Sequence, residues 1–198
     1  MGNPVVIVGS GLAGYAVARE LRKLDAEAAI IMLSADHGGF YSKPMLSNAL
    51  SSGKNPDSIL NGDAAQMASQ LKIFIRPHCR VAAIDPAGYA VTLIDSEKIG
   101  YNRLVLAIGA DQIHLPLSGD GVAKILSIND LDDYKKFRDA LTGKKRISII
   151  GAGLIGCEFA NDLATAGYHV DVIDIGAQPL GRLLPPAGGA FIRQKLEA

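Results

Sequence analysis

Two short apolar runs near the start of the chain enclose a segment with helical spacing. Residues 5 to 8 are consecutive β-forming residues, and residues 29 to 33 form a second apolar run. Between the runs, apolar side chains recur at helical intervals among charged residues: Leu12, Ala16, Val17, Leu21 and Leu24. This spacing predicts a strand, a helix and a second strand that lies parallel to the first.

A glycine-rich turn joins the first apolar run to the helix. It reads Gly9-Ser10-Gly11-Leu12-Ala13-Gly14, and Asp36 follows the second strand. In this spacing Gly9 permits a tight turn, Gly11 lets the backbone approach a pyrophosphate, and Gly14 lets helix and strand pack closely. The helix N-terminus offers unpaired N–H groups to the phosphates, and the acid can accept a hydrogen bond from a ribose hydroxyl. The segment therefore predicts a dinucleotide site.

The same arrangement recurs in the last third of the chain. A strand at residues 146 to 150 leads into the turn Gly151-Ala152-Gly153-Leu154-Ile155-Gly156. We expect a helix from about Gly153 to Ala166 with Gly167 just beyond its end, then a strand from Tyr168 to Ile173 that ends at Asp174. Chance glycine turns do not explain two complete fingerprints, so the sequence predicts one resident and one exchanging dinucleotide cofactor.

The pattern between the two fingerprints predicts a β-meander inserted before the chain returns to a parallel sheet. The expected elements are a helix at 63–71, strands at 72–76, 79–84, 89–94 and 100–107, and a helix at 129–141 with Asn129 as its N-cap. Pro44 suits the first turn of another helix, which would place Lys43 at the start of that helix. Residues 51 to 62 are polar and rich in turn-forming residues, and a last helix is expected from Ala187.

Composition excludes several classes of partner. Lys+Arg and Asp+Glu both number 20, so the chain lacks the basic excess that nucleic-acid binding requires. We expect no signal peptide, no transmembrane segment and a cytoplasmic location. Cys79 and Cys157 fit neither a metal nor a redox spacing, so both are expected to be reduced structural residues. The histidines share no ligand spacing and are interpreted as ordinary residues: His37, His78, His114 and His169.

Five segments make the sequence similar to a known family. They are the Gly9–Gly14 turn, Tyr41–Ser47 (YSKPMLS), Leu104–Ala110 (LVLAIGA), Ile128–Tyr134 (INDLDDY) and Gly151–Leu163 (GAGLIGCEFANDL). They resemble the pyridine nucleotide–disulfide oxidoreductase family, and within it the bacterial rubredoxin-reductase branch. The resemblance implies an α/β, Rossmann-like fold that binds two dinucleotides, with FAD at the first fingerprint and NAD(P)H at the second.

The resemblance also implies roles for residues outside the glycine turns. Ser34, Ala35 and Asp36 fall where the strand end meets the FAD adenosine, although Asp36 lies slightly past the usual position of a ribose-binding acid. Val81 falls where the backbone contacts the adenine. Lys43 and Glu158 fall where a lysine lies against the flavin ring and a glutamate reaches that lysine. Physical reasoning alone leaves Lys43 evenly divided between this role and a solvated lysine, and favours a solvated carboxylate for Glu158.

The sequence departs from the family pattern in three respects. Tyr41–Ser47 contains no cysteine, which excludes dithiol chemistry, and Asn48 replaces a lysine that several ferredoxin reductases carry. The second of these departures favours the rubredoxin-reductase branch over the ferredoxin-reductase branch. The third departure is length: the chain is similar to the N-terminal half of such an enzyme, with an FAD-binding domain at residues 1–115 and a truncated NADH-binding domain at 116–198.

These observations leave three functional hypotheses open. The first is an enzyme that passes electrons from NADH through FAD to a small iron-centre protein, for which rubredoxin is the expected example. The second is a nucleotide-binding fragment without turnover, and the third is a ferredoxin- or nitrite-reductase-type enzyme of the same family. NADH is expected over NADPH because Asp174 would repel a 2′-phosphate and no cation follows before Arg182.

Overall fold

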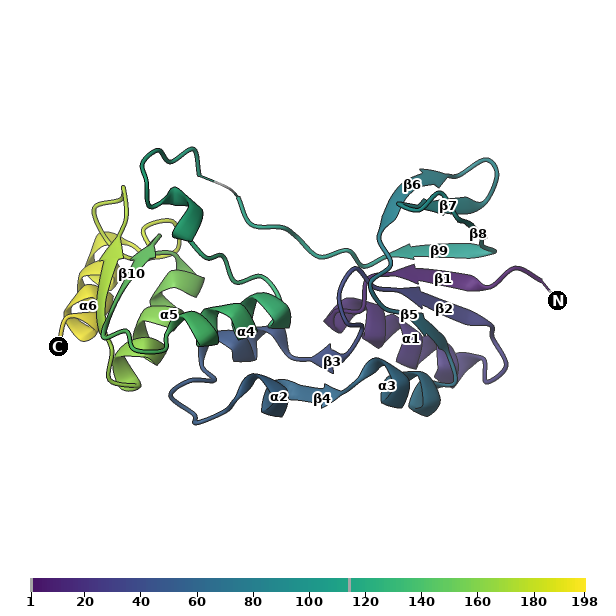
Figure 1. Ribbon diagram of the computed structural model, residues 1–198, viewed down its shortest axis with the longest axis horizontal. Coiled ribbons are helices and arrows are strands. Elements are labelled where there is room, and N and C mark those ends of the chain that lie inside the picture. Colours follow the sequence, from purple (N-terminus) through teal and green to yellow (C-terminus); the bar gives the residue numbers. More distant parts are fainter. Residues whose placement is uncertain (1, 114) are drawn as a thin grey trace. The chain divides into compact units, whose positions relative to one another are not determined.

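The computed structural model describes residues 2–113 and 115–198, so His114 lies outside the described residues. The chain forms two compact units (Figure 1). The first unit contains residues 1–43 and 60–125, and the second contains residues 44–59 and 126–198. Segment 44–59 therefore belongs to the second unit, although the first unit precedes and follows it in the sequence. The proposed domain boundary at residue 115 stays a prediction.

The first unit is built on a four-stranded parallel sheet. Its order is β5 (Phe74–Arg76), β2 (Ile30–Leu33), β1 (Val5–Val8) and β9 (Arg103–Leu106). Val5 of β1 pairs with Ile30 on one side and with Arg103 on the other. Helix α1 (Leu12–Leu24) connects β1 to β2, which confirms the predicted strand–helix–strand unit. The glycine turn thus follows a central strand, at the carboxyl edge of the sheet.

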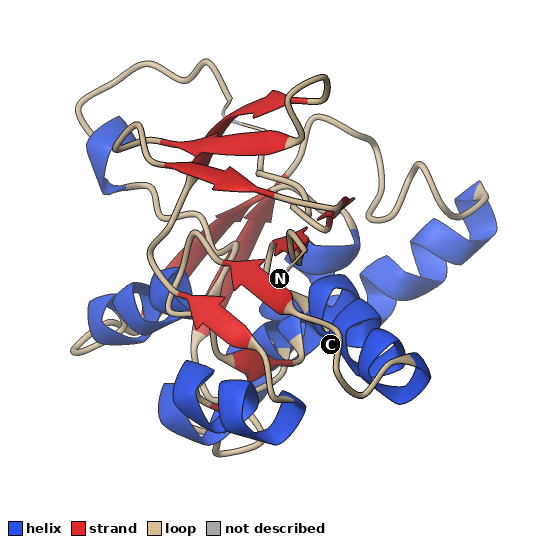
Figure 2. Ribbon diagram, turned by 90° about the vertical axis from the view of Figure 1, so that its right-hand side faces the viewer, coloured by secondary structure: helices blue, strands red, loops and turns tan. Residues whose placement is uncertain are grey.

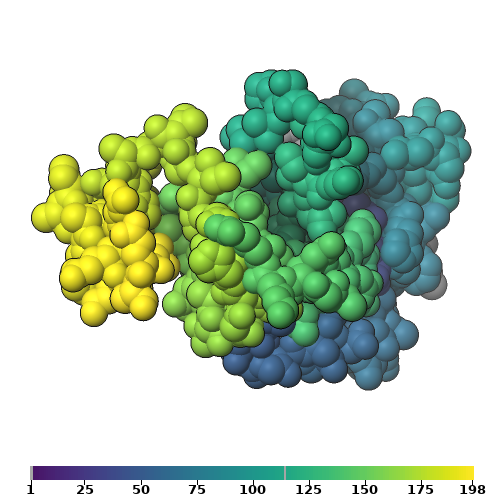
Figure 3. Space-filling model, turned by 60° about the vertical axis from the view of Figure 1, so that its left-hand side comes forward, coloured from purple at the N-terminus to yellow at the C-terminus, as the bar shows by residue number. Residues whose placement is uncertain are grey.

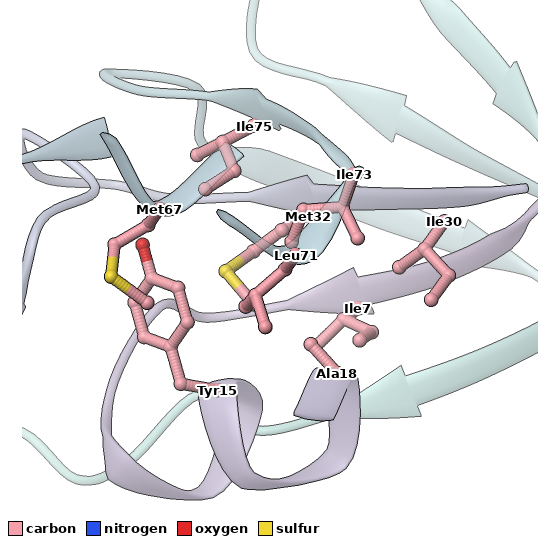
Figure 4. Packing of buried hydrophobic residues seen from close by; sticks show 9 residues of the cluster. All are labelled: Ile7, Tyr15, Ala18, Ile30, Met32, Met67, Leu71, Ile73 and Ile75. Carbon is pink, nitrogen blue, oxygen red and sulfur yellow. The ribbon is translucent and has the colours of Figure 1, made fainter. Parts of the chain in front are cut away.

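Helices α1 and α3 (Ala64–Leu71) supply side chains to the first unit's core. Tyr15 and Ala18 of α1 are fully buried, and Met67 and Leu71 of α3 are nearly so. Figure 4 shows these residues with apolar side chains of the sheet and of Ile73, which directly precedes β5; the sheet residues are Ile7, Ile30, Met32 and Ile75. Burying each such large apolar side chain contributes about 1.5–3 kcal/mol, so this core holds α1 firmly against β1.

A separate antiparallel sheet forms the predicted β-meander. Its strands are β6 (Val81–Asp85), β7 (Ala90–Leu93) and β8 (Lys98–Gly100). Val91 and Leu93 of β7 form a core cluster with Val6 and Leu33 of the parallel sheet. The single strand expected at 100–107 is two strands, β8 and β9. The chain turns at Tyr101 and Asn102 because their N–H groups donate to Tyr89 O and Pro4 O, which direct β8 toward β7 and β9 toward β1. A two-stranded ladder also joins β3 (Phe40–Tyr41) to β4 (Leu60–Gly62).

The second unit repeats the β-α-β arrangement with two described strands. β10 (Arg146–Ile150) and β11 (His169–Ile173) pair in parallel, and α5 (Leu154–Thr165) connects them. The unit also contains helices α2 (Pro56–Ile59), α4 (Leu131–Ala140) and α6 (Pro186–Leu196). Figure 2 shows all helices of the chain in blue and all strands in red. The rings of Phe137 and Phe159 meet edge to face at 5.8 Å, which packs α4 against α5. Most of α6 is exposed and is the yellow surface in Figure 3.

The structure corrects several predicted elements. The N-cap of α4 is Asp130, not Asn129: its carboxylate accepts a hydrogen bond from the Asp133 N–H at 2.8 Å. The helix expected near Pro44 is the five-residue 3-10 helix η1 (Lys43–Ser47). Segment 51–62, predicted as loop, contains α2 and β4, and a second 3-10 helix, η2, spans Val122–Lys124. Gly167 follows the end of α5 with a φ of +92°, as predicted.

Candidate functional site

The first glycine turn has the conformation that its spacing predicts. Gly9 has a φ of +109°, and a Cβ there would lie 2.1 Å from the Ala107 carbonyl oxygen. A Cβ on Gly14 would lie 2.0 Å from the Gly9 carbonyl oxygen, so only glycine lets α1 start this close to β1. Gly11 differs, since a Cβ there would have no atom within 4 Å. Gly11 therefore borders open space where Gly9 and Gly14 border protein.

The second glycine turn repeats this geometry. Gly151 has a φ of +107°, and a Cβ on Gly156 would lie 1.9 Å from the Gly151 carbonyl oxygen. A Cβ on Gly153, like one on Gly11, would have no atom within 4 Å. The two turns are thus structural equivalents, and each leaves an open space beside its middle glycine. A ligand group could occupy this space, and a side chain at the middle glycine would displace that group.

Both helices that follow the turns begin with groups suited to an anion. Gly11 and Gly153 are the N-caps of α1 and α5, and neither makes a side-chain cap hydrogen bond. Neither helix has an acidic residue in its first turn. The first N–H groups of each helix thus face the open space with the positive end of the helix dipole, which is the arrangement that binds phosphate. Leu12, Ala13, Leu154 and Ile155 are exposed there.

The acid after β2 is turned toward its own glycine turn. Asp36 Oδ1 accepts hydrogen bonds from Ser10 Oγ at 3.1 Å, from the Gly38 N–H at 2.8 Å and from Ser34 Oγ. Burial alone would raise the pKa of Asp36, but the hydrogen bonds from Ser34 and Gly38 outweigh it and lower that pKa. Asp36 is half-buried, whereas Ala35 at the strand end is exposed.

The acid after β11 is exposed and holds the second turn through backbone groups. Asp174 accepts hydrogen bonds from the Ala152 N–H and the Gly176 N–H, both at 2.6 Å. These bonds, with that from Ala152 the stronger influence, lower the pKa of Asp174. An ionised carboxylate therefore stands beside the second glycine turn and in contact with solvent.

Helix α5 also carries two acids that bind segment 44–59 within the second unit. Glu158 Oε2 accepts a hydrogen bond from Ser47 Oγ at 2.6 Å. Four residues on, Asp162 is buried and accepts bonds from the Leu50 N–H at 3.1 Å, the Ser51 N–H at 2.8 Å and Ser51 Oγ at 2.5 Å. Residues four apart share a helix face, so the two acids bind one continuous segment.

Sequence reasoning identified Glu158 but missed Asp162 and Ser47. The available signal was the acid pair at positions 158 and 162, one turn apart on an otherwise uncharged helix. Two other predicted residues, Lys43 and Val81, lie in the first unit. Lys43 is exposed and starts η1, while half-buried Val81 starts β6 and packs beside Val91 and Leu93.

The chain contains two cysteines, at positions 79 and 157. Cys79 and Cys157 are free thiols, and burial raises the pKa of each. Neither thiol is therefore activated as a nucleophile. Within residues 2–113 and 115–198, no group of three or more potential ligands could hold a metal ion. In the same ranges, no helix is long and apolar enough to span a membrane.

Comparison with known proteins gives consistent matches over nearly the whole chain. Residues 3–198 match the family model described as "Pyridine nucleotide-disulphide oxidoreductase". The chain is 49% identical over 183 residues to a rubredoxin-NAD(+) reductase of Alcanivorax borkumensis, a match that covers 92% of the chain and 47% of that relative. A rubredoxin-NAD(+) reductase of Acinetobacter baylyi is also 49% identical, over 98% of the chain and 51% of the relative. The chain thus spans about half the length of these curated relatives.

Solved structures share the fold at similar coverage. The NADH:rubredoxin oxidoreductase of Clostridium acetobutylicum matches with a TM-score of 0.83 and 29% identity, over 98% of the chain and 50% of that structure. The reductase in a putidaredoxin reductase–putidaredoxin complex matches with a TM-score of 0.88 and 30% identity, over 99% of the chain and 48% of that structure. The predicted α/β, Rossmann-like fold is confirmed.

Proposed function

Because the chain belongs to the pyridine nucleotide-disulphide oxidoreductase family, we propose that it binds FAD at Gly9–Gly14 and NADH at Gly151–Gly156. The protein then acts as an NADH-dependent flavoprotein reductase. The observation that carries the proposal is the pair of equivalent turns, in which Gly11 and Gly153 border open space at uncapped helix N-termini. A pyrophosphate supplies the negative charge that these N–H groups are arranged to bind.

Each site has residues suited to its ligand. In the first, the backbone of Gly9, Ser10, Gly11, Leu12, Ala13 and Gly14 surrounds the open space, and Ser34, Ala35 and Val81 are proposed to meet the adenosine by resemblance. In the second, Gly151, Gly153, Leu154, Ile155 and Gly156 form the turn, and the exposed carboxylate of Asp174 is proposed to accept a hydrogen bond from a ribose hydroxyl. A 2′-phosphate would instead meet that negative charge, so NADH is favoured over NADPH.

Lys43 and Glu158 are the proposed catalytic residues. A bound flavin takes two electrons as a hydride and releases them singly. The Lys43 ammonium would stabilise negative charge that develops near it, an effect that is larger in a site with little water. Glu158 would keep that lysine protonated, since a buried lysine alone tends to lose its proton. In the second unit Glu158 already accepts a hydrogen bond from Ser47 at 2.6 Å, which fixes the direction of its carboxylate.

The proposed electron acceptor is a small iron-centre protein such as rubredoxin. Two curated relatives at 49% identity are named rubredoxin-NAD(+) reductases. Dithiol chemistry is not part of the proposal because Tyr41–Ser47 contains no cysteine and both cysteines elsewhere in the chain are free thiols with raised pKa. A ferredoxin-type reductase is the second candidate, supported by the 29% identity to a solved ferredoxin reductase from Rhodopseudomonas palustris.

The test is the colour and turnover of the purified protein. We expect a yellow protein whose flavin absorbance bleaches with NADH and recovers when oxidised rubredoxin is added. Rubredoxin should be reduced faster than a plant-type ferredoxin by the same preparation. A colourless protein that cannot be reconstituted with FAD would support the alternative of a nucleotide-binding fragment without turnover. Faster reduction of ferredoxin would favour the second candidate.

A further inference from the structure

A hydrogen-bonded cluster in the first unit joins the glycine turn to the loop after β2. Its members are Ser10 of the turn, Ser34 and Asp36 after β2, and the Gly38 N–H. Ser10 and Ser34 are only 7% and 1% exposed. Three donors converge on a single oxygen, Asp36 Oδ1. Such convergence on one atom indicates that the carboxylate organises the protein around it.

The protons in this cluster have one consistent arrangement. Ser34 Oγ donates to Asp36 Oδ1, and Ser10 Oγ lies 2.6 Å from Ser34 Oγ but 3.1 Å from Asp36 Oδ1. The Ser10 hydroxyl proton is therefore shared between Ser34 Oγ and Asp36 Oδ1, and the ionised carboxylate accepts at the end of the relay. The lowered pKa of Asp36 is consistent with a charge that persists at neutral pH. Tyr15 of α1 binds the same loop through the Gly38 carbonyl.

Both fingerprint acids bind their own glycine turns, but they differ in burial. Asp174 is exposed and accepts from two backbone N–H groups, one on each oxygen, and one of these groups belongs to Ala152 of the turn. Asp36 is half-buried, and a single oxygen accepts from Ser10 of the turn, from Ser34 and from the Gly38 N–H. The burial and the three bonds on one oxygen suit an acid that fixes a turn, whereas the exposed Asp174 carboxylate is also open to a ligand.

We propose that Asp36 is a positioning residue for the FAD pyrophosphate: through Ser34 and Ser10 it fixes the first glycine turn in its binding conformation and does not contact the adenosine ribose. The proposal rests on the proposed FAD site. A turn that is fixed before binding loses less conformational entropy when the ligand arrives, so the cluster should strengthen binding of the pyrophosphate without touching it.

The test compares two ligands and two acids in the full-length polypeptide. Dissociation constants are measured by flavin fluorescence for FAD and for an FAD analogue that carries 2′,3′-dideoxyadenosine. Asp36→Ala should weaken both ligands by the same factor, about 10- to 100-fold, since a hydrogen bond to a charged group contributes about 1.5–3 kcal/mol. Asp95→Ala is the matched control: Asp95 is an exposed acid of the same unit that also accepts from the N–H two residues later. It should change neither constant.

Two further variants, Asp36→Asn and Ser34→Ala, make the outcome decisive. Asp36→Asn keeps an acceptor oxygen and should lose less affinity than Asp36→Ala. Ser34→Ala should weaken FAD alone but add little to Asp36→Ala, because both act through one relay. A loss that disappears with the dideoxy analogue would identify Asp36 as a ribose ligand and overturn the proposal, as would unchanged binding by a folded Asp36→Asn and Ser34→Ala. Failure of the unaltered protein to bind FAD would instead overturn the proposed function.

Discussion

The two glycines Gly11 and Gly14 are only three positions apart, yet the structure predicts opposite consequences for their substitution. Gly14 is enclosed by protein, because a Cβ there would lie 2.0 Å from the Gly9 carbonyl oxygen. Gly11 is open, because a Cβ there would have no atom within 4 Å. We therefore expect Gly14→Ala to destabilise the fold, and Gly11→Val to leave the fold intact but abolish FAD binding.

The magnitudes follow from the contacts. Overpacking costs typically about 1–3 kcal/mol, and a backbone carbonyl cannot swing away as a side chain can. The backbone clash puts Gly14 at the upper end of this range. The gain of about 1 kcal/mol from replacing a helical glycine offsets part of the cost, so Gly14→Ala should lose about 2 kcal/mol. At Gly11 the backbone is extended, with φ −73° and ψ −173°, which any residue adopts. The cost expected for Gly11→Val is the loss of a favourable N-cap residue, which is about 1 kcal/mol.

The assay separates stability from binding. Unfolding by urea is measured on FAD-free protein, because bound FAD would add stability by mass action and hide the difference. FAD affinity is measured separately, and Gly11→Val should lose at least about 100-fold, or about 2.7 kcal/mol. Gly121→Val is a suitable control, since that glycine has a negative φ of −85° and open surroundings away from the turn.

Two results would refute this reasoning. A Gly11→Val protein with its normal flavin content would show that the first turn is not the FAD site and that the two cofactors are assigned in the wrong order. A Gly14→Ala protein as stable as the unaltered one would show that α1 does not depend on its close approach to β1.

Three other predictions concern the second unit and the catalytic residues. Asp174→Ala should reduce the preference for NADH over NADPH, measured by titration; equal binding of both by the unaltered protein would contradict the assignment. Lys43→Met and Glu158→Gln should each slow flavin reduction by NADH without loss of FAD, and stopped-flow measurement of the double variant should show much less than the summed loss. Fully additive losses would mean that the two residues act separately. Asp162→Ala should destabilise the second unit by about 3 kcal/mol in urea unfolding, because three donors around Ser51 lose a buried anionic acceptor; an unchanged midpoint would contradict this.

The sequence predicted those parts of the fold that depend on local rules. The strands and helices around both turns follow from hydrophobic periodicity, and Gly9 and Gly14 follow from steric limits that apply wherever this turn occurs. The β-meander was also predicted, because its strands are consecutive and joined by short turns. In each case the residues that decide the structure lie within about one element of each other.

Contacts between distant parts of the sequence could not be predicted in this way. Asp162 and Ser51 are 111 positions apart, and nothing near either residue indicates the other. The same holds for Ser47 and Glu158, whose hydrogen bond replaces the solvated carboxylate that physical reasoning alone favoured. The inward direction of Asp36 was also hidden, because it depends on a relay through two serines on separate elements. Only the folded chain shows which partner a polar side chain has.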